Sequence, residues 1–487
     1  MRSRRSRTSH SPESEGSVCP LSNRRRRGTA LTAVLFVVAV VAGCSHTGPV
    51  NSVPRTAALT DDWNGVLPPP DEQLPIGITL TADGGSASVP VLGIYDRPLE
   101  QLSLLPDAIS FAIPGLSGDP VFHGRYDPAG DDLTGTITRS GRDTALTLHR
   151  GEVVAPPRPQ EPQPPWPYRS EDVRYRSGDV SIAGTLTLPR APGRYPAVVL
   201  ISGSGPQDRD ERIAGHKPFL LLADTLTRAG YAVLRTDDRG VGATTGHLDT
   251  SNYTDLTDDI MAGLGYLRGR PDIDGDRIGL IGHSEGGYLA PLAATRPDSR
   301  LAFVIMLAGP AVPGSEVLLA QNEAFLRSAD TDRETVRHRV GYITTLTTLI
   351  RSGDREQVIR FATDHNDALP PELRQPQSAI DDLTTPYFDA LVDYDPTPAL
   401  QALHIPVLAT YGSKDMQVPA AQSAPAARAA LAGNPRAEVH VFDGINHMLQ
   451  PADTGSPQEY GRIETTIAPE VLTYLTSWLE SHVTPAR

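Results

Sequence analysis

The stretch Ile278-Gly-Leu-Ile-Gly-His-Ser-Glu-Gly-Gly287 organises the rest of the chain. Its apolar run ends at Gly282, and helical spacing of apolar residues resumes a few positions later. The pattern predicts a strand, a tight turn and a helix. A serine at such a turn needs small neighbours, because its backbone is strained and the flanking chains approach closely. Gly282 and Gly286 provide that room, so Ser284 is a candidate nucleophile; the alternative is a glycine-rich connection without chemistry.

Two side chains in the last third of the chain would complete a catalytic set. A serine hydroxyl is a weak nucleophile near neutral pH and needs a histidine base, which an acid must orient. Asp415 and His447 each follow an apolar strand pattern, in the order expected of this architecture. His447 could alternatively be a loop histidine with a local partner, and Asp395 or Asp443 could replace Asp415 as the acid.

A nucleophilic serine also requires backbone donors for the oxyanion of the tetrahedral intermediate. One N–H group is expected from Glu285, which directly follows Ser284. The other should come from the loop Ser202-Gly-Ser-Gly-Pro206, which is built of small residues and follows a buried strand pattern. Within this loop we assign the N–H of Ser204.

The chain divides into segments of different pattern. Residues 61–154 show short alternating runs with glycine-rich turns, which predicts a small all-β sandwich or barrel as an accessory domain. Prolines crowd 155–171, as expected for a semi-rigid linker. From 172 to 487 buried strands alternate with helices, which predicts a mostly parallel α/β sheet covered on both faces. Within it, 314–398 has only helical patterns and is expected to be a lid.

The first 43 residues resemble a secretory signal peptide with a long basic extension. Four arginines precede an uncharged apolar core, which ends in Val41-Ala-Gly-Cys44 and is short for a membrane span. A cysteine after Val-Ala-Gly resembles the bacterial lipobox. We therefore expect Cys44 to carry lipid and to anchor the protein outside the cytoplasmic membrane, with 44–60 as a tether. An uncleaved anchor or an ordinary signal peptide is the alternative.

Charge and cysteine content narrow the possible partners. The chain has a formal net charge of −14; since the first 43 residues hold eight arginines and two glutamates, the remainder carries −20. So acidic a body disfavours nucleic acid as a partner. Cys19 and Cys44 are the only cysteines, and Cys19 precedes the expected cleavage site, so no disulfide or cysteine-ligated zinc is expected. The spacing of histidines and carboxylates predicts no metal.

Five motifs lie in the second half of the chain: Ser202-Gly-Ser-Gly-Pro-Gln-Asp-Arg-Asp210, Asp237-Asp-Arg-Gly-Val-Gly242, Gly282-His-Ser-Glu-Gly286, Gly412-Ser-Lys-Asp415 and Asn446-His447. Together they resemble the bacterial α/β-hydrolase esterases related to serine aminopeptidases. The likeness covers roughly 172–484, and the β-rich segment is similar to the N-terminal domain that some members carry. It implies the α/β-hydrolase fold, hydrolysis of carboxylic esters and no cofactor. Ser202 departs from the common His-Gly oxyanion motif.

The leading interpretation is a lipid-anchored serine esterase that acts on a small-molecule ester. A serine aminopeptidase or thioesterase would use the same residues, and a non-catalytic surface binding protein is a more remote alternative. Because polar residues interrupt the lid helices and the body is acidic, we expect short-acyl, neutral substrates. The charged runs Asp208–Asp210 and Asp238–Arg239 are interpreted as salt bridges that shape the site rather than as a substrate clamp.

Overall fold

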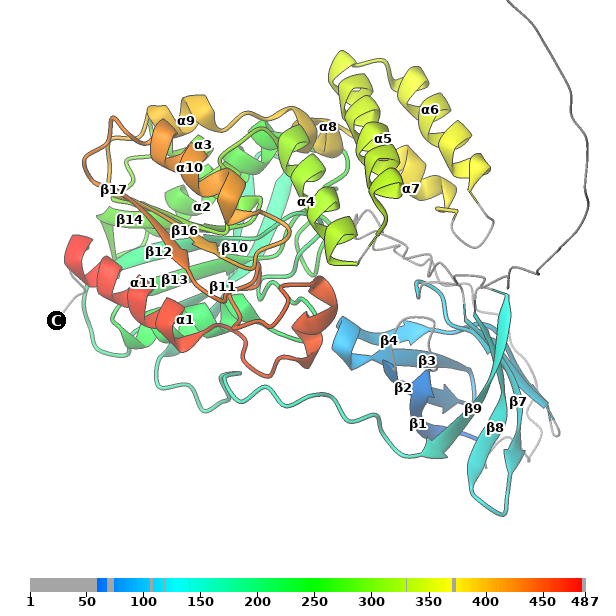
Figure 1. Ribbon diagram of the computed structural model, residues 1–487. Coiled ribbons are helices and arrows are strands. Elements are labelled where there is room, and N and C mark those ends of the chain that lie inside the picture. Colours follow the sequence, from blue (N-terminus) through cyan, green and yellow to red (C-terminus); the bar gives the residue numbers. More distant parts are fainter. Residues whose placement is uncertain are drawn as a thin grey trace, which may run out of the picture. The chain divides into compact units, whose positions relative to one another are not determined.

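The computed structural model describes residues 59–67, 74–105, 108–116, 120–139, 141–329, 331–369 and 374–483. The expected signal peptide, Cys44 and most of the expected tether lie outside these ranges. The described strands form two sheets, one in the first third of the chain and one after it (Figure 1). Among the described helices, none has the length and apolar character needed to cross a membrane.

The first sheet is antiparallel throughout and has nine strands. Its order is β4-β3-β2-β1-β9-β8-β7-β6-β5, so that two chain neighbours, β4 and β5, form opposite edges. Because only Leu99 separates these strands, the sheet must curl until its edges meet, as in a barrel. The strands are β1 (Asp61–Leu67), β2 (Leu74–Thr81), β3 (Gly84–Val89), β4 (Ile94–Pro98), β5 (Glu100–Leu105), β6 (Ala108–Ala112), β7 (Val121–Asp127), β8 (Asp132–Arg139) and β9 (Arg142–Arg150).

The expected all-β region is therefore present, although its sequence pattern reveals only part of it. The alternating runs predict β2, β3, β6, β8 and β9 and miss the other four strands; these runs are 76–80, 87–92, 108–112, 133–138 and 145–148. The missed β4 and β5 bury none of their side chains fully, so they lack the alternation that a half-buried strand shows. The predicted strand end at Pro90–Leu92 is instead a short 3₁₀ turn.

The second sheet has the order β10-β11-β13-β12-β14-β15-β16-β17. Its first two strands are antiparallel to their neighbours, and β13 to β17 are parallel in this order. This is the mostly parallel α/β sheet that the alternation predicts. The strands are β10 (Arg169–Ser177), β11 (Val180–Leu188), β12 (Tyr195–Ile201), β13 (Ala232–Thr236), β14 (Ile273–His283), β15 (Val304–Leu307), β16 (Val407–Gly412) and β17 (Ala437–Phe442).

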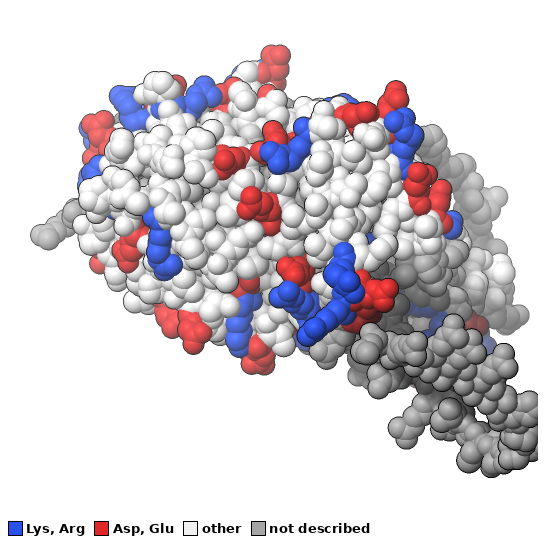
Figure 2. Space-filling model, turned by 45° about the horizontal axis from the view of Figure 1, so that its top comes forward, with Lys and Arg blue, Asp and Glu red and all other residues white. Residues whose placement is uncertain are grey.

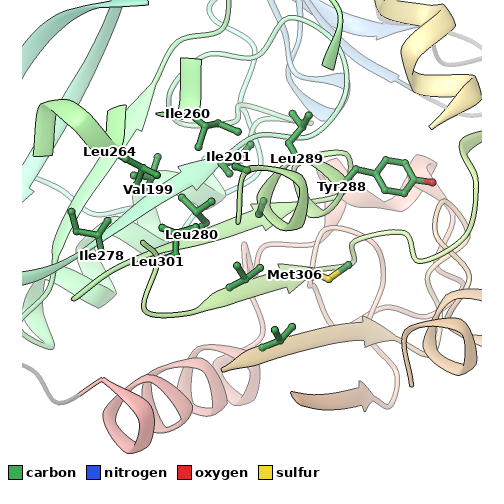
Figure 3. Packing of buried hydrophobic residues seen from close by; sticks show 14 of the residues in the cluster. Val199, Ile201, Ile260, Leu264, Ile278, Leu280, Tyr288, Leu289, Leu301 and Met306 are labelled. Carbon is green, nitrogen blue, oxygen red and sulfur yellow. The ribbon is translucent and has the colours of Figure 1, made fainter. Parts of the chain in front are cut away.

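Helices cover both faces of this sheet, as Figure 1 shows. On β12, Val199 and Ile201 point into one core with Leu280 and Ile260, drawn in Figure 3, whereas Val198 and Leu200 point into the other. This burial on both faces explains why the strand is apolar at every position. The first core lies under α2 (Tyr253–Arg268), α3 (Gly286–Ala294), α9 (Thr397–Gln401) and α10 (Ala420–Ala430), and the second under α1 (Pro218–Arg228) and α11 (Pro469–His482).

The expected lid is a helical segment between β15 and β16 with a small core of its own. It contains α4 (Gly314–Ser328), α5 (Arg333–Ser352), α6 (Arg355–Ala368), α7 (Gln377–Asp381) and α8 (Pro386–Asp393). The sequence pattern predicts one continuous helix over 378–394, and this is wrong. Thr385 is extended (φ −74°, ψ 148°), because a residue before proline avoids the helical region.

The proline-rich segment is bound to the α/β region along its length rather than being a spacer alone. The Arg158 guanidinium donates to the carbonyl oxygens of Ala214 (3.2 Å) and Gly461 (2.7 Å). The Gln160 carboxamide donates to the Ile467 carbonyl (2.8 Å) and accepts from the Thr466 N–H (2.7 Å). The contact with Ala214 holds the loop that follows the expected oxyanion residues, and the other contacts hold the segment that precedes α11.

Candidate active site

Ser284 lies at the turn between β14 and α3, as the sequence pattern predicts. Its φ of 53° is in the left-handed region that side chains other than glycine rarely adopt. A Cβ at Gly282 would lie 2.0 Å from the Gly286 carbonyl oxygen, and one at Gly286 would lie 2.2 Å from the Ile201 carbonyl oxygen. Only glycine fits at these two positions, so backbone contacts determine where Ser284 stands relative to the end of β12.

Asp415 and His447 lie in the loops after β16 and β17 and are in direct contact. The His447 Nδ1 is 2.8 Å from Asp415 Oδ2, and both side chains are buried. The other oxygen, Oδ1, accepts from the N–H groups of Gln417 and Val418, each at 2.8 Å. Since a carboxylate only accepts, Nδ1 carries the proton and leaves the Nε2 of a neutral ring as an acceptor.

The two alternative acids are engaged elsewhere. Asp443 is exposed and accepts a hydrogen bond from the Ser413 hydroxyl at 2.9 Å. Asp395 is also exposed, and it accepts from the Thr397 N–H at 2.9 Å where α9 begins. The structure therefore brings Asp415, and neither of these, to His447.

The loop after β12 places its backbone beside the serine. A Cβ at Gly203 would lie 3.2 Å from the Cβ of Ser284. The N–H of Gly203 donates to Glu211 Oε1 (2.7 Å), and that of Gly205 donates to the Tyr387 hydroxyl (2.8 Å). Between them, the N–H of Ser204 makes no hydrogen bond within the described part of the chain.

The N–H of Glu285 likewise has no partner among the described residues. Ser204 is exposed, whereas the Glu285 side chain is buried. The two donors expected from the sequence thus remain available to an added oxygen atom.

Ser202, which departs from the common His-Gly oxyanion motif, stabilises this loop through its side chain. Its hydroxyl donates to Asp238 Oδ1 (3.0 Å). The other oxygen of this carboxyl, Oδ2, accepts from the Gln207 N–H (2.9 Å). Removal from water raises the pKa of the Asp238 carboxyl well above its usual range, against the opposing effect of these two donors. One carboxyl thereby joins the two ends of the loop 202–207, the expected oxyanion loop.

The side chain of Glu285 connects the site to the lid. Its carboxylate accepts from the hydroxyls of Tyr253 on α2 (2.7 Å) and Tyr387 on α8 (2.6 Å). Burial raises the pKa of Glu285 to about 7, although both tyrosines favour the charged form. Because Tyr387 also accepts from the Gly205 N–H, one lid residue bridges Glu285 and the oxyanion loop. The sequence pattern does not identify either tyrosine as a site residue, because no local pattern indicates a contact between residues so distant in the sequence.

The charged runs near the site form ion pairs within the fold. Arg209 contacts Asp237 at 2.6 Å, and Arg239 contacts Asp259 at 2.7 Å. This agrees with their interpretation as salt bridges that shape the loops. Within the described ranges, no group of three or more His, Cys, Asp or Glu side chains is arranged to hold a metal ion.

A cavity of about 60 Å³ lies behind the oxyanion loop. Gly203, Gly205 and Glu285 line it on the side of the loop, and three aspartates, Asp237, Asp238 and Asp259, add further carboxyls. The remaining lining includes apolar residues of the first core, among them Val199 and Leu289.

Comparisons with known proteins agree with this architecture. Residues 196–453 match the family model of the alpha/beta hydrolase fold. Esterase EstD of Thermotoga maritima is 27% identical over 301 residues, which are 60% of this chain and 65% of that protein. Dipeptidyl peptidase 8 of Homo sapiens is 38% identical over 127 residues, 23% of this chain and 13% of the peptidase. The chain thus spans less than two thirds of the length of either relative.

Among solved structures, the Pyrococcus furiosus esterase Pf2001 is similar with a TM-score of 0.41 and 16% identity, over 69% of this chain and 99% of the esterase. The proline iminopeptidase of Mycobacterium smegmatis gives a TM-score of 0.39 and 17% identity, over 64% of this chain and 98% of that one. The family model covers more than half of the chain, and the described sheet has the strand order and covering helices given above. The chain therefore belongs to the alpha/beta hydrolase fold family.

Proposed function

We propose that the protein is a serine hydrolase that cleaves carboxylic esters through Ser284, His447 and Asp415. The observation that carries this proposal is the buried 2.8 Å contact between His447 and Asp415, at the same edge of the sheet as the strained Ser284 turn. The likeness to esterase EstD supports an ester as the substrate.

In the proposed reaction, the Ser284 hydroxyl attacks the ester carbonyl carbon while His447 Nε2 takes its proton. The oxyanion that forms accepts hydrogen bonds from the N–H groups of Glu285 and Ser204. Collapse of the intermediate breaks the bond to the alcohol, which leaves with the proton from His447. Water then attacks the acyl-enzyme by the same route, and Asp415 holds the imidazole in the required tautomer throughout.

Ser284→Ala should abolish both ester hydrolysis and labelling by a fluorophosphonate, because the nucleophilic oxygen is removed. Mass spectrometry of the labelled protein measures the modification directly. The matched control is Ser328→Ala, which truncates an exposed serine of the lid and should leave labelling unchanged. Labelling that persists in Ser284→Ala would assign the nucleophile elsewhere, and a wild type that is never labelled would favour a binding protein.

Asp415→Asn should lower kcat by about 10³–10⁴-fold, because the amide favours the wrong tautomer of His447. Asp443→Asn and Asp395→Asn, which change exposed carboxylates, should stay within about threefold of wild type. Steady-state kinetics on a p-nitrophenyl ester at a fixed pH provide the comparison. Near-normal turnover by Asp415→Asn would mean that another acid orients His447.

We further propose that the lid restricts the enzyme to small or medium, neutral, short-acyl esters. The helices carry interior polar groups, such as Asn322, which is buried and donates to the Leu318 carbonyl. On the face shown in Figure 2, acidic and basic side chains are interspersed among uncharged ones.

The kcat/KM for p-nitrophenyl esters should therefore fall once the acyl chain passes about eight to ten carbons. Aminoacyl p-nitroanilides in the same assay test the peptidase alternative, which the likeness to dipeptidyl peptidase 8 raises. A kcat/KM that rises with chain length, or activation at an emulsion interface, would identify a lipase. Faster cleavage of the anilides would identify a peptidase.

For Cys44, we propose lipid attachment and anchoring at the outer face of the cytoplasmic membrane, on the basis of Val41-Ala-Gly-Cys44. Mass spectrometry of the protein from a membrane fraction should find an acylated Cys44 as the first residue. Cys44→Ala should release the protein from the membrane, whereas Cys19→Ala, which changes the only other cysteine, should not. A membrane-bound Cys44→Ala protein, or another mature N-terminus, contradicts the proposal.

A further inference from the structure

A second acid–histidine pair lies behind the site, and the proposed reaction does not use it. Glu211 belongs to the loop after β12, is 1% exposed and has a φ of 51°, which is costly for a residue other than glycine. Its Oε1 accepts from the Gly203 N–H (2.7 Å) and lies 2.8 Å from His283 Nδ1. Its Oε2 has no hydrogen-bond partner among the described residues.

His283 directly precedes Ser284 and is hydrogen-bonded at both ring nitrogens. Nδ1 faces the Glu211 carboxylate, and Nε2 lies 3.0 Å from the carbonyl oxygen of His447. A carboxylate and a carbonyl can only accept, and a neutral imidazole has a single N–H. While Glu211 is ionised, both bonds form together only if the ring is an imidazolium.

The surroundings of His283 favour the same charge state. Burial opposes protonation, but the charge of Glu211 and its hydrogen bond outweigh it, so the pKa of His283 is raised. The other titratable groups that face this ring are Asp415, whose charge acts in the same direction, and His447, whose ring centroid is 4.9 Å away. A cavity of about 10 Å³ beside the pair is otherwise lined by apolar side chains, including Phe219 and Leu307.

We propose that Glu211 and His283 form a buried ion pair that positions the three parts of the catalytic site. Glu211 accepts a hydrogen bond from the N–H of Gly203 and so holds the oxyanion loop at the residue that directly precedes Ser204. Through the His447 carbonyl, the imidazolium holds the loop of the base, and its own backbone leads into Ser284. This inference rests on the proposed function, since it assigns the pair to the machinery of that reaction.

The ion pair makes activity depend on pH in a defined direction. Because the pKa of folded His283 is raised, both hydrogen bonds are present below that pKa and one is lost as the pH rises through it. Glu211→Gln keeps the shape and an oxygen that can accept from Gly203, but it removes the charge that holds the proton on His283.

Glu211→Gln should therefore lower kcat by about 10–100-fold at pH 8 and leave KM within about threefold, as expected for a small misplacement of reacting groups. The alkaline limb of its pH–kcat profile should lie at least about one pH unit below that of wild type. The control is Glu161→Gln, which removes a partly exposed charge paired with Lys217 and should leave the limb in place. A wild-type kcat, or a lower kcat with an unshifted limb, overturns the proposal.

A second measurement does not require ester hydrolysis. In Ser284→Ala protein with ¹⁵N-labelled histidine, nuclear magnetic resonance should show both ring nitrogens of His283 protonated at pH 7, with the signal assigned by its loss in His283→Gln. A neutral His283 at pH 7 would overturn the ion pair even if the esterase assignment stands. A protonated His283 in a protein without esterase activity would instead count against the proposed function alone. If Glu211→Gln does not fold, the protonation state of His283 in the Ser284→Ala protein is the deciding test of the ion pair.

Discussion

The close approach of three backbone segments at Gly282, Gly286 and Ile201 is the constraint on which the rest of the site depends. Side chains at the two glycines would overlap carbonyl oxygens at 2.0 and 2.2 Å, closer than any real contact. The end of β14, the start of α3 and the end of β12 are therefore packed backbone to backbone. Ser284 and the oxyanion loop take their relative position from this packing, which no side-chain rotation can relax. The strained φ of Ser284 is maintained in the same way.

Around this frame, three buried carboxyl groups are stabilised by different sets of donors. Asp415 receives two backbone N–H groups and His447, and Glu285 receives two tyrosine hydroxyls. Glu211 receives one backbone N–H and the His283 ring. A buried charge without partners is strongly destabilising, so each of these groups depends on its donors in the folded protein. They also join the lid, the oxyanion loop and the loop of the base into one network.

The sequence is sufficient to predict the α/β sheet and the contact of His447 with Asp415, because each candidate directly follows a strand and the carboxyl ends of parallel strands share one edge. It does not reveal Tyr387 or Glu211. Their partners are 102 and 72 residues away, and no local periodicity encodes a contact of that kind. The break in the lid helix could have been predicted from Pro386, because the residue before a proline avoids the helical region. The strands β4 and β5 could not, because they are half-exposed and show no clear alternation.

The most direct test of the central claim is a crystal structure of the protein inhibited by a phosphonate ester. We expect a covalent bond from Ser284 Oγ to phosphorus. The phosphoryl oxygen, which stands for the oxyanion, should lie about 2.7–3.1 Å from the backbone nitrogens of Glu285 and Ser204. His447 should retain its contact with Asp415. Phosphorus on another residue, or an oxygen that turns away from both nitrogens, would contradict the account.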